Sequence, residues 1–213
     1  MNFADLIVWM LKGTGVTLTV AGYSLAIAVP FALIFGVLQF RFGGKARFAI
    51  TGFIEFWRSS SVIILLFFFY YVCPAFGLRL SGYTVSALVI GCNIGAYGSQ
   101  AVRSALASLS EGQVEAGRSL GLTRNQILFL VELPQALRKI VPIAGNETIE
   151  ILKTTANVSL IGLADITFRA KEAMQVAYQP AEIYTGLILI YVAICLPVAI
   201  ATRRIAGKMT AKR

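Results

Sequence analysis

Long apolar stretches alternate with short polar ones along the whole chain. A helix that crosses a bilayer needs about 20 mostly apolar residues. Five stretches reach that length, at 16–40, 48–72, 83–106, 143–163 and 183–201. The pattern therefore predicts an all-α fold, an integral membrane helical bundle of about five transmembrane helices. We expect one transmembrane domain that spans residues 1–213.

Two of these stretches are less apolar than the others. The stretch at 48–72 carries Glu55 and Arg58 in its first third, and the stretch at 143–163 holds several charged and amide side chains. Residues 164–182 are too polar to span and predict a short helix outside the bilayer, ended by Pro180.

Composition supports a membrane protein. The hydrophobic fraction is 57%, the charged fraction is 14% and the mean hydropathy is +0.76, whereas soluble domains average about 45–50% apolar and about 25% charged. The chain contains no histidine, which excludes imidazole catalysis and histidine metal sites. Its three cysteines are widely spaced and match no metal motif, so we expect no metal site and read them as small apolar residues.

Basic residues set the expected orientation in the membrane. The net charge of +9 comes from residues placed between apolar runs, which indicates topology and not nucleic-acid binding. Of 19 lysines and arginines, four lie on one predicted side and two within spans; the other side holds the remaining 13. Because basic loops stay in the cytoplasm, we expect the N-terminus outside and the C-terminus in the cytoplasm.

One cytoplasmic segment, at about 108–136, is polar yet rich in helix start and stop signals. Ser110 with Gln113, and Thr123 with Gln126, match the capping-box pattern. Gly121 supplies a left-handed stop between two short helices, and Pro134 is expected to bound the second. This segment is either a rigid knob that a soluble partner pushes or an ordinary helical loop that packs on its own bundle.

The spacing in this segment resembles the EAA loop of ATP-binding-cassette importer permeases. That pattern is E-A-A, three residues, G, nine residues, then I-x-L-P. Here glycine replaces the second alanine and valine replaces the isoleucine. The matching residues are Glu115, Ala116, Gly117, Gly121, Val131, Leu133 and Pro134.

The resemblance covers about residues 15–205 and is strongest over 96–162, where it is similar to the polar amino acid branch of these permeases. The motifs that carry it include Ala96-Tyr97, Leu120-Gly121-Leu122 and Leu133-Pro134-Gln135-Ala136. The chain departs from the family at Gln100, where an acid is usual, at 59–61, where G-T-P is usual, and at 153–157. These departures concern the solute more than the coupling machinery.

The resemblance implies a type I importer permease that binds no cofactor and is not an enzyme. Two permease chains, identical or related, would form the pathway in the bacterial inner membrane, and two separate ATPase subunits that use ATP would dock on the EAA loops. An extracytoplasmic solute-binding protein would deliver a polar amino acid or a derivative. On this reading Gly121→Asp abolishes transport and leaves membrane insertion intact.

The polar stretch at 143–163 is the second candidate site. Asn146, Glu150, Lys153 and Asn157 share one helical face, and ionisable groups cost about 2.5–3.5 kcal/mol each at mid-membrane, so they should face the bundle or a wet cavity. This face either lines the substrate pathway or holds a structural Glu150–Lys153 ion pair. Residues expected on the same wall are Arg58, Asn93, Gln100 and Glu147.

We interpret two apolar features as structural, with a role in packing. Gly91 and Gly95 form a G-x-x-x-G pair that allows close helix contact, and the phenylalanines at 67–69 should face lipid or the core. Other functions stay open: a permease for methionine or another small nutrient, a stand-alone secondary transporter or channel, or a membrane scaffold or sensor.

Overall fold

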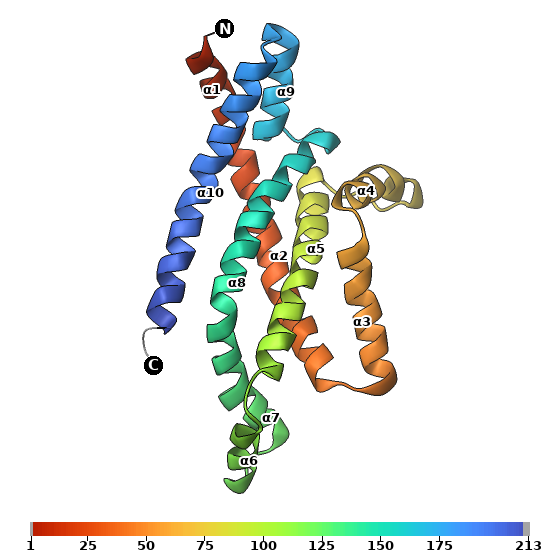
Figure 1. Ribbon diagram of the computed structural model, residues 1–213. Helices are drawn as coiled ribbons and strands as arrows, with labels where there is room; N and C mark the ends of the chain where they lie inside the picture. Colours follow the sequence, from red (N-terminus) through yellow and green to blue (C-terminus); the bar gives the residue numbers. More distant parts are fainter. Residues whose placement is uncertain (1, 211–213) are drawn as a thin grey trace.

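The computed structural model describes residues 2–210, and every regular element in that range is helical. The elements are α1 (Phe3–Leu11), α2 (Thr14–Arg41), α3 (Gly44–Ser59), α4 (Val62–Phe67), η1 (Phe68–Val72), η2 (Cys73–Phe76), α5 (Gly82–Ala107), α6 (Glu111–Ser119), α7 (Arg124–Ile127), η3 (Leu128–Glu132), α8 (Leu133–Thr154), η4 (Thr155–Ile161), α9 (Ile166–Ala177) and α10 (Pro180–Thr210). Figure 1 shows an elongated bundle with α1 and α9 at one end and α6 and α7 at the other.

Helices α2 and α5 form the centre of the bundle and pack on each other along most of their length. Small residues allow this approach. A side chain at Gly91 would start 2.8 Å from the carbonyl oxygen of Ser24, and one at Gly95 would start 2.9 Å from that of Ala28. The expectation that these glycines serve helix packing is confirmed.

Among the described residues, three helical stretches are long and apolar enough to cross a membrane: 3–41, 82–107 and 180–207. A fourth is possible if α3 and the following segment form one broken span. Helix α8 has 22 residues but carries five charged side chains, so its hydropathy does not mark it as a spanning helix. Its place in the bundle, between α5 and α10, makes it the fifth candidate span.

The stretch at 48–72 is not one straight helix, which corrects the sequence expectation. It bends by 94° between α3 and the segment that starts at α4, and α4 projects sideways from the bundle in Figure 1. The break falls at Ser60 and Ser61, whose backbones are extended. Phe69 beyond the break packs on Trp57 of α3, while Phe67 and Phe68 are exposed.

The outer helix predicted at 164–182 is α9, which begins after Asp165. The Asp165 carboxylate accepts hydrogen bonds from the backbone N–H groups of Thr167 and Phe168. The helix ends at Ala177, and Pro180 starts α10 instead of ending α9. Helix α9 packs on α1 and α10 at the end of the molecule that holds the N-terminus (Figure 1).

Candidate functional site

The segment at 108–136 lies at the opposite end of the molecule from α9, beyond the C-terminal end of α5 (Figure 1). Helix α6 begins after Ser110, as predicted, but the Ser110 hydroxyl makes no capping hydrogen bond, so the first capping box is wrong. The Gln113 side chain bonds to Gln135 instead. The second box is present: Thr123 and Gln126 cap each other at the start of α7.

A tight corner joins α6 to α7. Gly121 has φ of +76°, which confirms the left-handed stop. The N–H of Gly121 donates to the carbonyl of Arg118, and the N–H of Leu122 donates to that of Gly117. Gly117 is buried, and a side chain there would start 2.9 Å from Ile127. Glycine at 117, where the family has alanine, thus lets α6 sit directly on α7.

Pro134 does not end the second helix, which is a further correction. Helix α7 passes through the π-turn η3 straight into α8, and Pro134 occupies the first turn of α8. Proline has no N–H to donate, and it follows a π-turn in which the N–H of Leu133 donates to the carbonyl of Leu128, so the regular helical bonding is already interrupted there. The segment is therefore continuous with the polar helix.

A charged pair stabilises this junction. Glu132 is 2% exposed, and its carboxylate accepts a hydrogen bond of 2.7 Å from the Arg124 guanidinium. The same guanidinium lies over the ring of Phe40, with 5.8 Å to the centroid, at the end of α2. Arg124 thus links the corner both to the start of α8 and to α2. Nothing in the local sequence points to this pair beyond an acid in an apolar run.

The predicted EAA-loop residues fall into two groups at the corner. Glu115 and Ala116 are exposed on α6, with Glu115 at the edge of a hollow, whereas Gly117 is buried against Ile127. A polar hollow of about 450 Å³ lies behind α6, between it and the ends of α2 and α5. An exposed, preformed helix above a hollow is a surface that a partner can grip and displace.

The polar residues expected on one wall do not converge in this single chain. Arg58 forms an ion pair with Glu55 at 2.5 Å and lies 5.2 Å from the ring centroid of Tyr97. The Tyr97 hydroxyl donates to the Arg58 carbonyl. This cluster sits at the break after α3, where free carbonyls need donors.

Asn93 and Gln100 on α5 serve as bridges between helices. Asn93 is 5% exposed and donates to the carbonyl of Trp57 at 2.6 Å. Gln100 donates to Gln39 of α2, which in turn donates to Thr51 of α3. These bonds satisfy the polar groups that break the apolar pattern of α5.

Helix α8 presents its polar residues on different sides. Glu147 enters a mostly apolar hollow of about 340 Å³ between α2, α5 and α8, with its Oε2 against Gly98. Asn146 lines a separate hollow of about 310 Å³ beside α10. Glu150 and Lys153 form an ion pair within α8 and are both more than half exposed, so the pair does not join two helices. Asn157 lies half-buried in η4.

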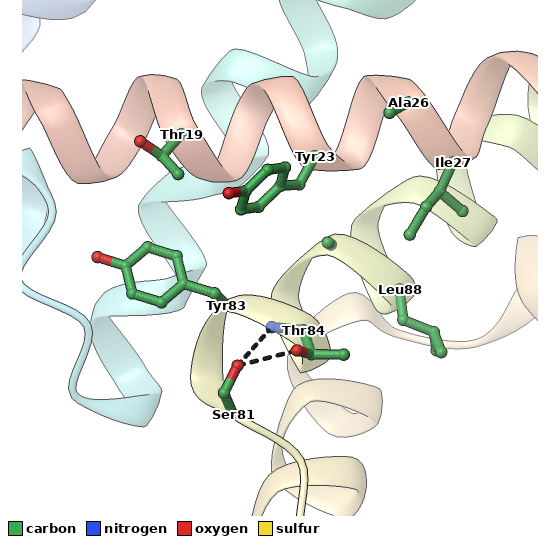
Figure 2. Close-up of a pocket in the computed structure, with 9 residues that line it drawn as sticks. Thr19, Tyr23, Ala26, Ile27, Ser81, Tyr83, Thr84 and Leu88 are labelled. Carbon is green, nitrogen blue, oxygen red and sulfur yellow. Dashed lines mark hydrogen bonds between the residues drawn. The ribbon is translucent and has the colours of Figure 1, made fainter.

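The largest of the described hollows, about 630 Å³, lies toward the N-terminal ends of α2 and α5. Figure 2 shows Tyr23 of α2 and Tyr83 of α5 at its rim, near Thr19 and Thr84. No charged side chain lines it. Sequence reasoning missed these residues because single tyrosines and threonines in apolar helices are unremarkable by pattern.

Asp165 is a second residue that the sequence did not single out. It lies outside the spanning helices and is fully buried. Burial raises the pKa of this carboxyl to about 6, although the backbone N–H groups of Phe168 and Thr167 oppose the shift. Tyr191 of α10 donates to it at 3.5 Å. This acid holds the start of α9 against α10.

Most of this chain matches a known protein family. Residues 28–211 match the family model described as the binding-protein-dependent transport system inner membrane component. The chain belongs to this family. It is therefore a multi-pass permease subunit of the inner membrane, and in this family ATPase activity lies on a separate subunit.

Relatives with similar sequences support this membership over nearly the whole permease. The "Probable amino-acid ABC transporter permease protein y4tF" of Sinorhizobium fredii is 31% identical over 99% of this chain and 91% of its own length. The glutamine transport system permease protein GlnP of Escherichia coli is 31% identical over 94% of this chain and 92% of its own length.

A solved structure supports the fold. The permease in the crystal structure of an amino acid ABC transporter with histidines has a TM-score of 0.87 and 26% identity. The alignment covers 98% of this permease and 99% of that chain. Family membership also implies ATPase and solute-binding partners. The permease subunits of this family bind no cofactor themselves.

Proposed function

We propose that this permease moves a polar amino acid or an amino-acid derivative into the cell. The relatives named for amino acids and for glutamine, which align along almost the whole chain, support this substrate class. A permease for methionine or another small nutrient is the alternative that an uptake panel separates.

The segment at 108–136 is the site that couples transport to a separate ATPase. The observation that carries this assignment is the corner at Gly121, with φ of +76°, which holds Glu115 and Ala116 on an exposed helix at one tip of the molecule. Gly117 packs on Ile127 beneath the corner, and Leu133 and Pro134 lie in the first turn of α8. ATP is bound and used by the partner, with two ATPase chains and two permease chains in the complex.

In the proposed orientation, the N-terminus lies outside and the C-terminus lies in the cytoplasm. Two observations support it. Most of the basic residues gather on one predicted side, and the segment at 108–136, the turn between α2 and α3 and the C-terminus lie toward the same end in Figure 1. The solute-binding protein would meet the end that carries α9.

The polar residues are proposed to border the pathway only once a second permease chain is present. Glu150 and Lys153 are exposed in the single chain, and charged groups at membrane depth require a partner or water. A second chain against this face of α8 would enclose them. Arg58, Asn93, Gln100, Asn146, Glu147 and Asn157 would then shape or support the lining from their own helices.

Purification from native membranes through a tag at the C-terminus tests this proposal. We expect a chain with a GxxxxGK[ST] motif at stoichiometric yield, and ATP-driven uptake by the purified complex with its binding protein in proteoliposomes. Labelled glutamine, arginine, histidine and methionine form the panel. An intact complex without an ATPase, or uptake driven by an ion gradient with this chain alone, would contradict the proposal.

A further inference from the structure

Two glutamines join the proposed coupling helix to the polar helix. Gln113 of α6 donates from Nε2 to Oε1 of Gln135 at 3.0 Å, and Gln135 of α8 donates from Nε2 to Oε1 of Gln113 at 2.7 Å. The two residues are 22 positions apart. Gln135 also donates to the carbonyl of Val131, which fixes its side chain on its own helix.

The surroundings of α6 leave it dependent on such side-chain contacts. Among the described residues, α6 packs mainly on α7, and only over a short length. The hollow of about 450 Å³ separates it from the ends of those helices. Gly117 rests on Ile127 at one end of α6, and Gln113 meets Gln135 at the other. Two points of attachment determine the orientation of a rigid rod.

Paired amides are suited to this task. Each amide offers donors and an acceptor, so two of them facing each other form two antiparallel hydrogen bonds. Both side chains are part-buried, and a part-buried amide that loses its partner keeps an unsatisfied polar group. The contact is directional, and slippage of α6 along α8 would break both bonds together.

We propose that Gln113 and Gln135 form a clasp that makes α6 and α8 move as one body. Displacement of α6 by the ATPase then reaches the helix that carries Glu147 and Glu150 without loss at the joint. Both glutamines are positioning residues that act through α8. This inference rests on the proposed function of the segment at 108–136.

Substitution by glutamate separates a clasp from two independent contacts with the ATPase. In Gln113→Glu or Gln135→Glu alone, one amide remains to donate to the new carboxylate, so one hydrogen bond survives. In the double variant neither side chain can donate and two like charges face each other. A clasp therefore predicts strongly non-additive effects, whereas separate contacts would add.

The measurement follows the motion of α8 in the whole importer. The native cysteines are replaced by alanine, Ala144→Cys on α8 receives a spin label, and its spectrum is compared before and after ATP addition. We expect each single glutamate variant to keep at least half of the ATP-driven change and the double variant to lose about fivefold. The ion pair in Gln113→Glu/Gln135→Lys should restore it.

The matched control is Gln113→Glu/Gln126→Glu, which adds two negative charges to the same segment. Glutamate at 126 still caps Thr123 and the clasp retains one amide, so this control should respond like Gln113→Glu alone. A full ATP-driven change in Gln113→Glu/Gln135→Glu, with ATPase bound, would overturn the clasp. Absence of ATPase, or of any response, in the unsubstituted complex would instead overturn the proposed function and the clasp with it.

Discussion

The coupling segment and the polar face of α8 contrast sharply although they belong to one continuous stretch of chain. In the segment, Glu115, Gly117 and Gly121 fall within one corner, as their spacing predicts. On α8, residues predicted to share a wall face separate hollows or the exposed surface. The proposed coupling corner is formed within a single chain, whereas the residues of the proposed pathway are not brought together in one.

The difference follows from the range of the forces involved. Caps, glycine stops and proline positions act over three or four residues, so a corner needs only its own sequence. Which side of a spanning helix is buried depends on the helices that pack against it, and these include helices of other chains. We therefore expect changes at the corner to act through local geometry and changes on α8 to act through packing.

The largest loss of stability is expected from Gly145→Leu, which tests whether packing against α10 determines the orientation of α8. A side chain here would start 2.5 Å from Cβ of Thr202 on α10, an atom that cannot swing away. Overpacking of this kind costs typically about 1–3 kcal/mol, and we expect the upper end. Thermal unfolding of purified protein measures it. Gly112→Ala, with open space around it, is the control; equal stability of the two variants would show that α8 and α10 are not tightly packed.

Gly121→Val should come next, since it strains the corner and leaves the bundle intact. No atom lies within 4 Å of the added carbon, so the cost comes from φ alone, about 1–3 kcal/mol for a branched residue. ATP-driven uptake should fall by about tenfold, with membrane insertion unchanged. Gly121→Asn should retain more uptake, because asparagine tolerates the left-handed backbone. Normal uptake by the valine variant would contradict a role of the corner in transport.

Arg124→Gln leaves Glu132 without its cation beneath the corner. A fully buried broken pair costs about 3–5 kcal/mol, but Arg124 is 47% exposed, so we expect about 1–2 kcal/mol after solvent screening. Protease cleavage of the segment at 108–136 should speed up accordingly. Glu132→Gln keeps a hydrogen-bond acceptor and should be milder. If both variants resist cleavage like the parent, the pair does not stabilise the junction.

Glu150→Gln should have the smallest effect on stability and still alter transport. Its pair with Lys153 is exposed and lies within one helix, and such pairs contribute about 0.3–0.5 kcal/mol. Complex assembly and melting temperature should stay the same, while the KM for uptake should change several-fold if this face borders the pathway, as proposed. Uptake kinetics identical to the parent would leave only the structural reading of this ion pair.

The sequence predicted the spans and the corner more accurately than the joints between them. The serines at 59–61 hid a 94° break because three polar residues barely interrupt an apolar run. Pro134 suggested a stop because its place in the first turn of a new helix could not be told from a boundary. Gln113 matched a capping box, but Gln135, 22 residues away, took its side chain.

Site prediction met the same limit. The EAA-like spacing predicted the corner at Gly121 because its residues lie a few positions apart, and the coupling role of this corner is a proposal. The roles of Asn93 and Gln100 as bridges depend on Trp57 and Gln39, which no local pattern connects to them. Long-range contacts of this kind need coordinates or an alignment of related chains.

Chemical cross-linking tests the central claim, that the exposed helix α6 meets the ATPase, most directly. Ala116→Cys on α6 and Val176→Cys on α9 are both exposed and lie at opposite ends of the molecule. Each cysteine is labelled with a maleimide–benzophenone reagent in a permease background without native cysteines, and irradiation of the purified importer then inserts the benzophenone into C–H bonds of whatever chain lies beside it. We expect the ATPase to be cross-linked from residue 116 and not from residue 176. No cross-link from 116, or an equal yield from 176, would contradict it.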